Sequence, residues 1–479
     1  MKKRPNILFA LADDASHFGL YGHDFVRTPH IDALGRDGIV FENAFTPNPK
    51  CAPSRASILT GRFPWQNEEA CNHFGLFPAG FPLLPDLLED SGYSVGYTGK
   101  GWGPGDYPRN GLKRNPAGNC FNRCRLSPPE GSAIRDCDYA ENFRDFLDQA
   151  EPGKPFYFWY GCFEPHRPYT FGEGQGHGIR NSDIKAIPSY WPDTETVRTD
   201  LLDYAYEISW FDLHLGKMLD LLKERGLYED TLIVVTSDNG CPFPRVKGQM
   251  YEQDFHLPLV ACWGDRRVAG TRVRDLINFP DIMPTFLSLA DVPIPDSVCG
   301  RSFADALLSP CGGQVDPERS VTFFGREKHD LGREGDLGYP VRCIRDEHYL
   351  YVHNFAPERW PAGNPETGFT NCDGSPTKNE ILALHDAGED RLFLLSFGKR
   401  PREELYDIVQ DPECIRNLAP LPEFDTLRRS MKDRLFDFLR RTQDPRLADP
   451  DYFERFPYVG NDKHSWRALT EGRFVRQDF

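Results

Sequence analysis

The sequence predicts an α/β fold, followed by a smaller C-terminal domain with an antiparallel sheet and a helix. Short apolar runs alternate with amphipathic helical segments over the first part of the chain. A stretch rich in Pro, Gly and polar residues, Ser309 to Glu318, then separates this alternation from shorter strand-like runs. The length of 479 residues also suits a large domain with a smaller partner.

The first part of the chain reads as strands and helices in turn. Ile7 to Ala12 is a continuous apolar run that ends in Asp13 and Asp14, as in a buried parallel strand whose carboxyl end opens onto a site. The later segments predicted here are helices at Ile31 to Gly38, Ser54 to Thr60 and Leu83 to Ser91, strands at Ser94 to Thr98 and Phe156 to Cys162, a long helix at Asp200 to Arg225, a strand at Thr231 to Thr236 and a helix at Asp281 to Leu289.

The C-terminal part has a different pattern. Val341 to Ile344 and Tyr349 to His353 flank a short turn, which predicts antiparallel strands. Arg391 to Phe397 is rich in apolar residues, and Phe424 to Arg441 has helical periodicity. We therefore predict two domains, residues 1–325 and residues 326–479, of which the second completes the substrate pocket.

The charge balance limits the partners. Lys and Arg number 56 and Asp and Glu 72, giving a net charge of −16. A field of this sign repels polyanions, so we expect neither nucleic acid nor an anionic membrane as a partner. An anionic substrate would need a locally positive pocket. The sequence gives no signal of the oligomeric state.

The cysteines and the N-terminus indicate the compartment. The thirteen cysteines are scattered without a C-x-x-C pair, which favours free thiols over a disulfide framework. Met1 to Arg4 is basic, but the apolar run after it is short and ends in acids, unlike an export signal or a membrane span. We expect a cytoplasmic protein, or a periplasmic or secreted one if the N-terminus has been trimmed.

A cysteine stands at the predicted start of a helix. The string C-A-P-S-R, residues 51–55, is followed by L-T-G-R at residues 59–62. Pro53 suits the first turn of a helix, so Cys51 would lie just before a helix N-terminus, whose unpaired N–H groups favour anions. A small buried thiol beside a helix start is the alternative interpretation.

Two pairs of oxygen-bearing side chains follow two of the predicted strands. They are Asp13 with Asp14, and Asp238 with Asn239. Each pair by itself also suits a helix cap or a turn. Together, three carboxylates and an amide oxygen suit one hard divalent cation. A dizinc site would need several His ligands, and no Asp-His pair supplies them.

Four cationic residues lie near these strands and the cysteine. Lys100 and His166 each follow a predicted strand, Lys247 follows Asp238, and Arg55 lies one helical turn after Cys51. Each by itself is more typical of a surface charge.

The strings at residues 51–55 and 59–62 resemble the formylglycine motif of type I sulfatases. Further strings, at residues 4–8, 28–32, 237–244, 339–342, 404–407 and 417–419, are similar to the sulfamidase (heparan N-sulfatase) branch of that family. The resemblance covers nearly the whole chain. It implies an alkaline-phosphatase-like sulfatase fold, with a large mixed sheet flanked by helices.

The resemblance also implies the chemistry. A separate maturation enzyme would oxidise Cys51 to formylglycine, whose hydrated aldehyde attacks sulfur with one hydroxyl and uses the other to expel sulfate. A calcium ion would be bound by the two oxygen-bearing pairs and by the residue derived from Cys51. Sulfated carbohydrate would be the substrate.

The cations receive roles by the same resemblance. Arg55 would orient the hydrated aldehyde, and Lys100 and Lys247 would hold sulfate oxygens. His166 with Lys247 would face the leaving group, which either can protonate. Many sulfatases have a His two residues after the lysine matched by Lys100, and this chain has Trp102 there.

The missing His is usually assigned to the step that releases sulfate. His17 and His73 are the candidates to replace it.

Two segments are expected to shape specificity. Residues 100–125 carry six basic residues against one acid, and residues 325–330 carry mixed charges. Each segment is also consistent with a solvated surface. The candidate substrate-binding residues of these segments are Trp102, Arg109, Glu327 and His329.

We therefore predict exo-action on a single terminal sulfated sugar, preferentially an N-sulfated glucosamine. The alternatives are a carbohydrate O-sulfatase, a phosphonate or phosphodiester hydrolase on the same scaffold, and an inactive sulfatase-like protein that binds glycans. The local positive charge of residues 100–125, in an otherwise acidic chain, favours one confined sulfate site over a long groove.

Overall fold

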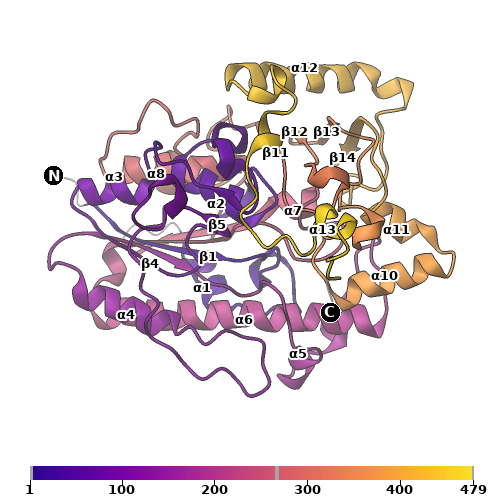
Figure 1. Ribbon diagram of the computed structural model, residues 1–479. Helices are drawn as coiled ribbons and strands as arrows, with labels where there is room; N and C mark the ends of the chain where they lie inside the picture. Colours follow the sequence, from indigo (N-terminus) through magenta and orange to yellow (C-terminus); the bar gives the residue numbers. More distant parts are fainter. Residues whose placement is uncertain (1–3, 265–268, 477–479) are drawn as a thin grey trace.

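A computed structural model describes residues 4–264 and 269–476. Within these ranges, eight strands form a large sheet and four form a second, antiparallel sheet (Figure 1). Residues 1–3 lie outside the described residues. They are part of the basic N-terminal segment, Met1 to Arg4, that was compared with an export signal. Each helix in the described ranges is too short or too polar to span a lipid bilayer.

The large sheet is mixed, which confirms the predicted class. Its strand order is β10-β2-β8-β7-β1-β6-β4, with β9 paired to β2. Strands β7, β1, β6 and β4 are parallel neighbours, whereas β8 runs antiparallel to β7 and β2. The bounds are β1 (Asn6–Ala12), β2 (Ile39–Phe45), β4 (Ser94–Gly99), β6 (Phe156–Gly161), β7 (Thr231–Ser237), β8 (His256–Trp263), β9 (Thr271–Val273) and β10 (Ile277–Asn278).

The register of the parallel strands aligns their carboxyl ends. Ala12 at the end of β1 pairs with Ser237 at the end of β7, and on the other side Leu11 pairs with Gly161 of β6. Gly161 in turn pairs with Gly99 at the end of β4. The residues that follow these four strands therefore emerge at one edge of the sheet, where α/β folds place ligands.

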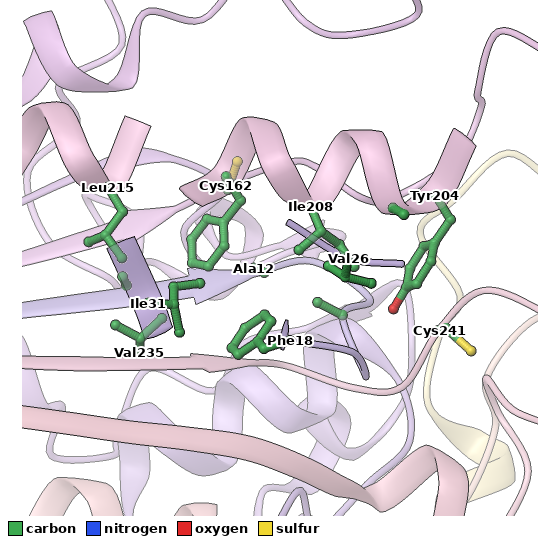
Figure 2. Packing of buried hydrophobic residues seen from close by; sticks show 14 of the residues in the cluster. Ala12, Phe18, Val26, Ile31, Cys162, Tyr204, Ile208, Leu215, Val235 and Cys241 are labelled. Atoms are coloured by element: carbon green, nitrogen blue, oxygen red, sulfur yellow. The ribbon is translucent and has the colours of Figure 1, made fainter. Parts of the chain in front are cut away.

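Helices cover both faces of the large sheet. One face packs against α1, α4 and α6, and the other against α2, α3 and α8. On the first face, Tyr204, Ile208 and Leu215 of the long helix α6 lie over Ala12 and Val235 (Figure 2). The bounds of these helices are α1 (Pro29–Asp37), α2 (Cys51–Thr60), α3 (Leu84–Asp90), α4 (Tyr139–Gln149), α6 (Glu195–Glu224) and α8 (Ile282–Leu289).

Short elements connect these layers. They are β3 (Gly75–Leu76), β5 (Gly105–Asp106), α5 (Glu173–Gly176), α7 (Glu252–Phe255) and α9 (Ala304–Leu308). The predicted helix after Cys51 differs from the observed one only in its start, because α2 begins at Cys51 itself, with Lys50 as its N-cap. The three residues before the predicted start at Ser54 continue the same helix, and Pro53 is accommodated in its first turn.

The second sheet has the order β11-β12-β13-β14, and α12 packs across it (Figure 1). Its strands are β11 (Val321–Arg326), β12 (Val341–Asp346), β13 (Tyr349–Asn354) and β14 (Glu403–Asp407), and the helices of this part are α10 (Pro376–Asp386), α11 (Asp390–Ser396), α12 (Asp425–Arg441) and α13 (Trp466–Thr470).

The structure adds detail to the predicted C-terminal part. The antiparallel strands β12 and β13 and the helix α12 were expected. Helices α10, α11 and α13 come in addition to the single helix predicted, and α11 is formed by the apolar segment at Arg391. The predicted boundary between residues 325 and 326 falls inside β11. The small sheet thus begins at Val321, just after the Pro- and Gly-rich stretch.

Candidate active site

The two oxygen-bearing pairs predicted from the sequence meet at the strand ends. Asp238 Oδ1 accepts a hydrogen bond from the Asp14 N–H at 3.1 Å, and the Asn239 amide donates to Asp14 Oδ1 at 2.7 Å. The four side chains are almost completely buried. Asp14 has a left-handed backbone, with φ of 73°, which is uncommon for a residue other than glycine. The turn after β1 therefore has a left-handed backbone at Asp14, within this cluster.

Helix α2 brings Cys51 and Arg55 to the same cluster. The Cys51 thiol lies 3.9 Å from Asp14 Oδ1. Arg55, fully buried one turn later, donates from Nε to Asp238 Oδ2 at 2.7 Å and from Nη1 to the Lys100 carbonyl at 2.7 Å. Through these two hydrogen bonds, Arg55 ties the start of α2 to the ends of β4 and β7.

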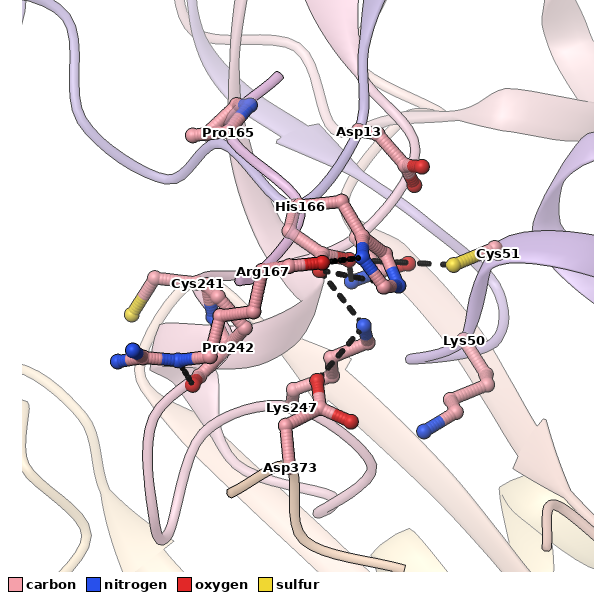
Figure 3. Close-up of polar contacts among 12 residues, drawn as sticks. Asp13, Lys50, Cys51, Pro165, His166, Arg167, Cys241, Pro242, Lys247 and Asp373 are labelled. Atoms are coloured by element: carbon pink, nitrogen blue, oxygen red, sulfur yellow. Dashed lines mark hydrogen bonds and ion pairs between the residues drawn. The ribbon is translucent and has the colours of Figure 1, made fainter. Parts of the chain in front are cut away.

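Two lysines neutralise the acids in this structure. Lys100 Nζ donates to Asp13 Oδ2 at 2.6 Å, and Lys247 Nζ donates to Asp14 Oδ2 at 2.6 Å. Lys247 also lies 2.9 Å from Asp373 Oδ2. His166 Nε2 is 4.0 Å from Asp14 Oδ2. Figure 3 shows the side chains of His166, Lys247 and Cys51 converging from three separate segments.

The burial of these groups perturbs their protonation. Burial alone would raise the pKa of Asp13, but the charges of Lys100 and His166 hold it well below its ordinary value. Burial and the Asp13 charge raise the pKa of Asp238 to about 7. Burial and the Asp13 charge also raise the pKa of the Cys51 thiol well above its ordinary value. Cys51 is therefore a protonated thiol at neutral pH, unlike reactive cysteines.

The cluster fits a hard divalent cation. Asp13, Asp14, Asp238 and Cys51 each offer a ligand atom, and these atoms lie within 4.8 Å of one another. Two buried oxygens of the set, Asp13 Oδ1 and Asn239 Oδ1, have no hydrogen-bond partner among the described residues. A buried acceptor oxygen without a partner lowers the stability of the folded protein unless another group satisfies it. A calcium ion could do so here, because it prefers carboxylate and amide oxygens as ligands.

A cavity of about 650 Å³ opens beside the cluster. Asp13, Lys100, His166 and Lys247 line it. Cys51 does not line it, but the thiol lies within 4.8 Å of a ligand atom of both Asp13 and His166. The predicted nucleophile, the acid cluster and all four predicted cations thus lie together at the carboxyl edge of the large sheet, and three of these cations, Lys100, His166 and Lys247, line the cavity.

The cavity also contains His73, considered above as a replacement for the missing His, together with Lys50, Asp330 and Asp373, which sequence reasoning did not single out. Asp330 accepts from His73 Nδ1 at 2.7 Å and pairs with Lys50 Nζ at 2.9 Å, and all three line the cavity with Asp373. Burial lowers the pKa of His73 to about 4, so this imidazole is neutral at physiological pH. The position of Lys50 directly before Cys51 was the available signal.

The four predicted substrate-binding residues do not line the cavity. Trp102 is buried against Phe77, and its indole donates to the Ala52 carbonyl at 3.0 Å, so it supports α2. Arg109 lies exposed near the short strand β5. Glu327 directly follows β11, and its carboxylate points into the protein, where it forms buried ion pairs with Arg342 and Arg446.

His329 is likewise buried, where its ring contacts Asn48 at 3.0 Å. Its neighbour Asp330 is the member of this predicted segment that reaches the cavity. Of the two histidines considered as replacements for the missing one, His73 lines the cavity, whereas His17 packs against His23 and Tyr204. Of the segment at residues 325–330, the structure thus places Asp330 at the cavity and buries Glu327 and His329 away from it.

An α/β sheet with cations, a carboxylate cluster and a helix start at its carboxyl edge defines an enzyme that acts on an anionic group. The chain belongs to the sulfatase family, whose model matches residues 5–292. It is accordingly a sulfuric ester hydrolase.

Curated relatives extend over most of the chain. Human N-sulphoglucosamine sulphohydrolase is 29% identical, covering 94% of this chain and 93% of the relative. An ulvan-active sulfatase of Formosa agariphila is also 29% identical, covering 93% of this chain and 82% of the relative. The similarity therefore includes the C-terminal part beyond the matched family region.

Solved structures share the fold. One protein, solved in complex with its substrate D-glucosamine-2-N,6-O-disulfate, superposes with a TM-score of 0.68 at 19% identity, covering 94% of this chain and 99% of that one. The phosphonate monoester hydrolase of Agrobacterium radiobacter superposes with a TM-score of 0.67 at 19% identity, covering 92% and 96%. At these identities the structures establish the common fold alone.

Proposed function

We propose that this sulfatase hydrolyses the sulfate of a single terminal sulfated sugar, with N-sulfated glucosamine as the preferred unit. The observation that carries the proposal is the meeting of Cys51, the acid cluster and the cations Lys100 and Lys247 beside a cavity of about 650 Å³. Cavities of this size suit small ligands rather than polymers. The similarity to an N-sulphoglucosamine sulphohydrolase supports the choice of sugar.

The raised pKa of the Cys51 thiol argues against the unmodified residue as the nucleophile, and its place in the C-A-P-S-R string supports conversion to formylglycine by a separate maturation enzyme. A thiol with a raised pKa is a weak nucleophile, and thiolate chemistry would need the pKa to be lowered. The hydrated aldehyde of formylglycine needs no thiolate. Because Cys51 is the first residue of α2, a diol derived from it would lie at the helix N-terminus, which favours a bound anion.

The proposed reaction has two steps. The oxygen of one diol hydroxyl attacks sulfur and its O–H bond gives up a proton, while the S–N or S–O bond to the sugar breaks. His166 or Lys247 gives a proton to the departing nitrogen or oxygen, so one proton is released and one is taken up in this step. The second hydroxyl then loses its proton, the C–O bond to sulfate breaks, and the aldehyde re-forms with release of inorganic sulfate. Water adds to the aldehyde to restore the diol.

Charge at the site supports binding of the sulfate group. Lys100 and Lys247 lie on the cavity side of the acid cluster, within reach of an anion, and Arg55 holds Asp238 and α2 in place. When calcium is bound by Asp13, Asp14, Asp238 and Asn239, it supplies additional positive charge next to the reacting sulfate.

The test is sulfate release from a panel of glucosamines sulfated at N-2, O-3 or O-6, and from a 2-O-sulfated uronic acid, with an aryl sulfate and an aryl phosphonate beside them. The proposal expects the highest kcat/KM on the N-sulfated sugar. Turnover of O-sulfated sugars alone would select a carbohydrate O-sulfatase instead. Preference for the phosphonate would select the phosphonate hydrolase alternative. Binding without any turnover by converted protein would select a glycan-binding role.

A further inference from the structure

The imidazole ring of His166 is held by one hydrogen bond to the backbone. Its Nδ1 atom lies 2.7 Å from the carbonyl oxygen of Arg167. A carbonyl oxygen can only accept, so Nδ1 carries a proton and donates it. The opposite ring nitrogen, Nε2, lies 4.0 Å from Asp14 Oδ2, and His166 lines the cavity beside Cys51. The orientation of the ring toward the acid cluster therefore depends on where the Arg167 carbonyl lies.

The side chain of Arg167 is bound by a buried carboxylate. Its Nη1 and Nη2 atoms donate to the two oxygens of Asp200 at 2.7 and 2.9 Å, and the two side chains are only 9% and 2% exposed. Asp200 belongs to α6 and also accepts from the Thr377 hydroxyl at 2.6 Å. Two parallel hydrogen bonds hold a guanidinium group in one orientation, which a lysine cannot reproduce. Residue 167 is thus tied to the long helix α6.

A third hydrogen bond joins Arg167 to the segment that leads to Lys247. Arg167 Nε donates to the Pro242 carbonyl at 3.0 Å (Figure 3). The guanidinium carbon also lies 4.4 and 4.6 Å from two aromatic ring centres, those of Tyr169 and Phe243. Three of the five N–H donors thus bind protein groups. The side chain is therefore fixed in place between the segments that follow β6 and β7.

We propose that Arg167 is a positioning residue, whose ion pair with Asp200 holds the carbonyl that orients His166 for protonation of the leaving group. The inference rests on the proposed function, in which His166 is a proton donor. The transferred proton leaves Nε2 of the imidazolium, and the ring becomes neutral with its remaining proton on Nδ1, still bonded to the carbonyl. Misplacement of a reacting group by about 1 Å can lower the rate about 10²-fold, so a fixed carbonyl matters for this step.

Two variants remove the ion pair in different ways. Arg167→Lys keeps the positive charge and removes the bidentate bond, and Arg167→Met/Asp200→Asn leaves no buried charge unpaired. Arg198 offers the matched controls, because it binds the carboxylate of Asp193 through two hydrogen bonds, of 2.6 and 2.9 Å, and does not line the active-site cavity. The control variants are Arg198→Lys and Arg198→Met/Asp193→Asn.

Two substrates separate proton donation from other effects. N-sulfoglucosamine releases an amine, whose nitrogen must take up a proton, whereas nitrophenyl sulfate releases a phenolate that is stable without one. In both Arg167 variants, as in His166→Gln, we expect kcat to fall about 10²-fold on the first substrate and less than about threefold on the second. KM should change less than about twofold. The Arg198 controls should match wild type.

Two kinetic outcomes would overturn the inference. Equal losses of kcat on both substrates would indicate a structural role for Arg167. A raised KM with unchanged kcat would indicate that Arg167 contacts the substrate.

A double variant tests whether Arg167 acts through His166. In a His166→Gln background, Arg167→Lys should lower kcat on N-sulfoglucosamine no further, because the group that it positions is already absent. A further loss as large as that seen in the wild-type background would contradict the inference.

The ring itself is measured without turnover by ¹⁵N NMR of histidine-labelled protein, with His166→Gln to assign the signals. Neutral His166 should carry its proton on Nδ1 in wild type and in Arg198→Lys, and should show a mixture of both tautomers in Arg167→Lys. A proton on Nε2 in wild type, or an unchanged tautomer in Arg167→Lys, would overturn the inference. If these signals behave as expected but no sulfated sugar is hydrolysed, the proposed function fails and the positioning of the ring by Arg167 stands.

Discussion

Lys247 and Asp14 form a buried ion pair, with Nζ 2.6 Å from Oδ2, at the position where the acid cluster faces the cavity. The charge of Asp14, and behind it that of Asp373, raises the pKa of Lys247 well above its ordinary value against the effect of burial. Without a divalent cation, Lys247 thus serves as the counter-ion of Asp14. A bound cation would take over that role and leave the ammonium group to bind sulfate.

Calcium should stabilise the protein. After treatment with a chelator, added Ca²⁺ should raise Tm, because an ion that binds only the folded state adds about 2.7 kcal/mol at a hundredfold excess over Kd. The variant Asp238→Asn should lose most of the shift, and Asp296→Asn, at an exposed position, should retain it. Differential scanning fluorimetry measures this. A Tm that is unaffected by calcium, or a shift that persists in Asp238→Asn, would contradict the assignment.

Lys247→Met should separate the two roles of this lysine. The substitution leaves Asp14 and Asp373 without their counter-ion, so the free energy of unfolding in chelator should fall by about 3–5 kcal/mol. Calcium should restore much of this stability. It should not restore kcat, which we expect to fall about 10²–10³-fold through loss of a group that stabilises the transition state. Recovery of both stability and kcat on addition of calcium would refute the role of Lys247 in catalysis.

His73 should matter for activity and His17 should not. His73 lines the cavity and is oriented by Asp330, whereas His17 contacts His23 and Tyr204 elsewhere. We expect His73→Gln to lower kcat about 10²-fold, the scale of a lost acid–base group. His17→Gln is the matched control. The pH dependence of kcat distinguishes proton transfer from a structural effect, since only the former loses a limb of the profile. Equal activities of the two variants would exclude His73.

Acid should destabilise the protein through buried histidines such as His214. Burial lowers the pKa of His214 from the ordinary 6.5 to about 3. Between these values the unfolded chain binds a proton that the folded protein does not, so stability is lost as pH falls below 6.5, by up to about 1.4 kcal/mol per pH unit.

His214→Gln should reduce this slope, and His177→Gln, at an exposed position, should leave it unchanged. Urea unfolding between pH 7 and pH 5 measures the slopes. His214→Phe is a second variant that keeps an aromatic ring in the site. If wild type and both His214 variants lose stability equally, the burial of a neutral His214 is not the cause.

Part of the site could be predicted because it follows from strand geometry. Asp13, Asp238, Lys100 and His166 all come after strands that proved to be parallel neighbours, and the carboxyl ends of such strands share one edge. The apolar runs themselves identified those strands. Strands β2 and β8 were not predicted, although the apolar run of β8 was an available local signal; their antiparallel place in the sheet depends on long-range pairing.

The rest of the cavity comes from loops whose position no local pattern fixes. Asp330 and Asp373 reach the cavity from the C-terminal part, and Lys463 arrives from a segment more than two hundred residues after Lys247 in the chain. Glu327 and His329 were chosen for their chemistry, but the end of β11 directs both into the protein and leaves Asp330 at the cavity. Trp102 was likewise chosen for its chemistry. An aromatic residue near a site can contact substrate or fill the core, and its sequence position does not distinguish the two roles.

The central claim is that a modified Cys51 performs the reaction, and the most direct measurement relates activity to the modification. Preparations made with and without a formylglycine-generating enzyme are digested, and the peptide containing Cys51 is quantified by mass spectrometry alongside sulfate release from N-sulfoglucosamine. We predict that the rate per mole of protein rises in proportion to the converted fraction and extrapolates to zero without conversion, and that Cys51→Ala folds but is inactive. Full activity in protein that contains only unmodified Cys51 would contradict the account.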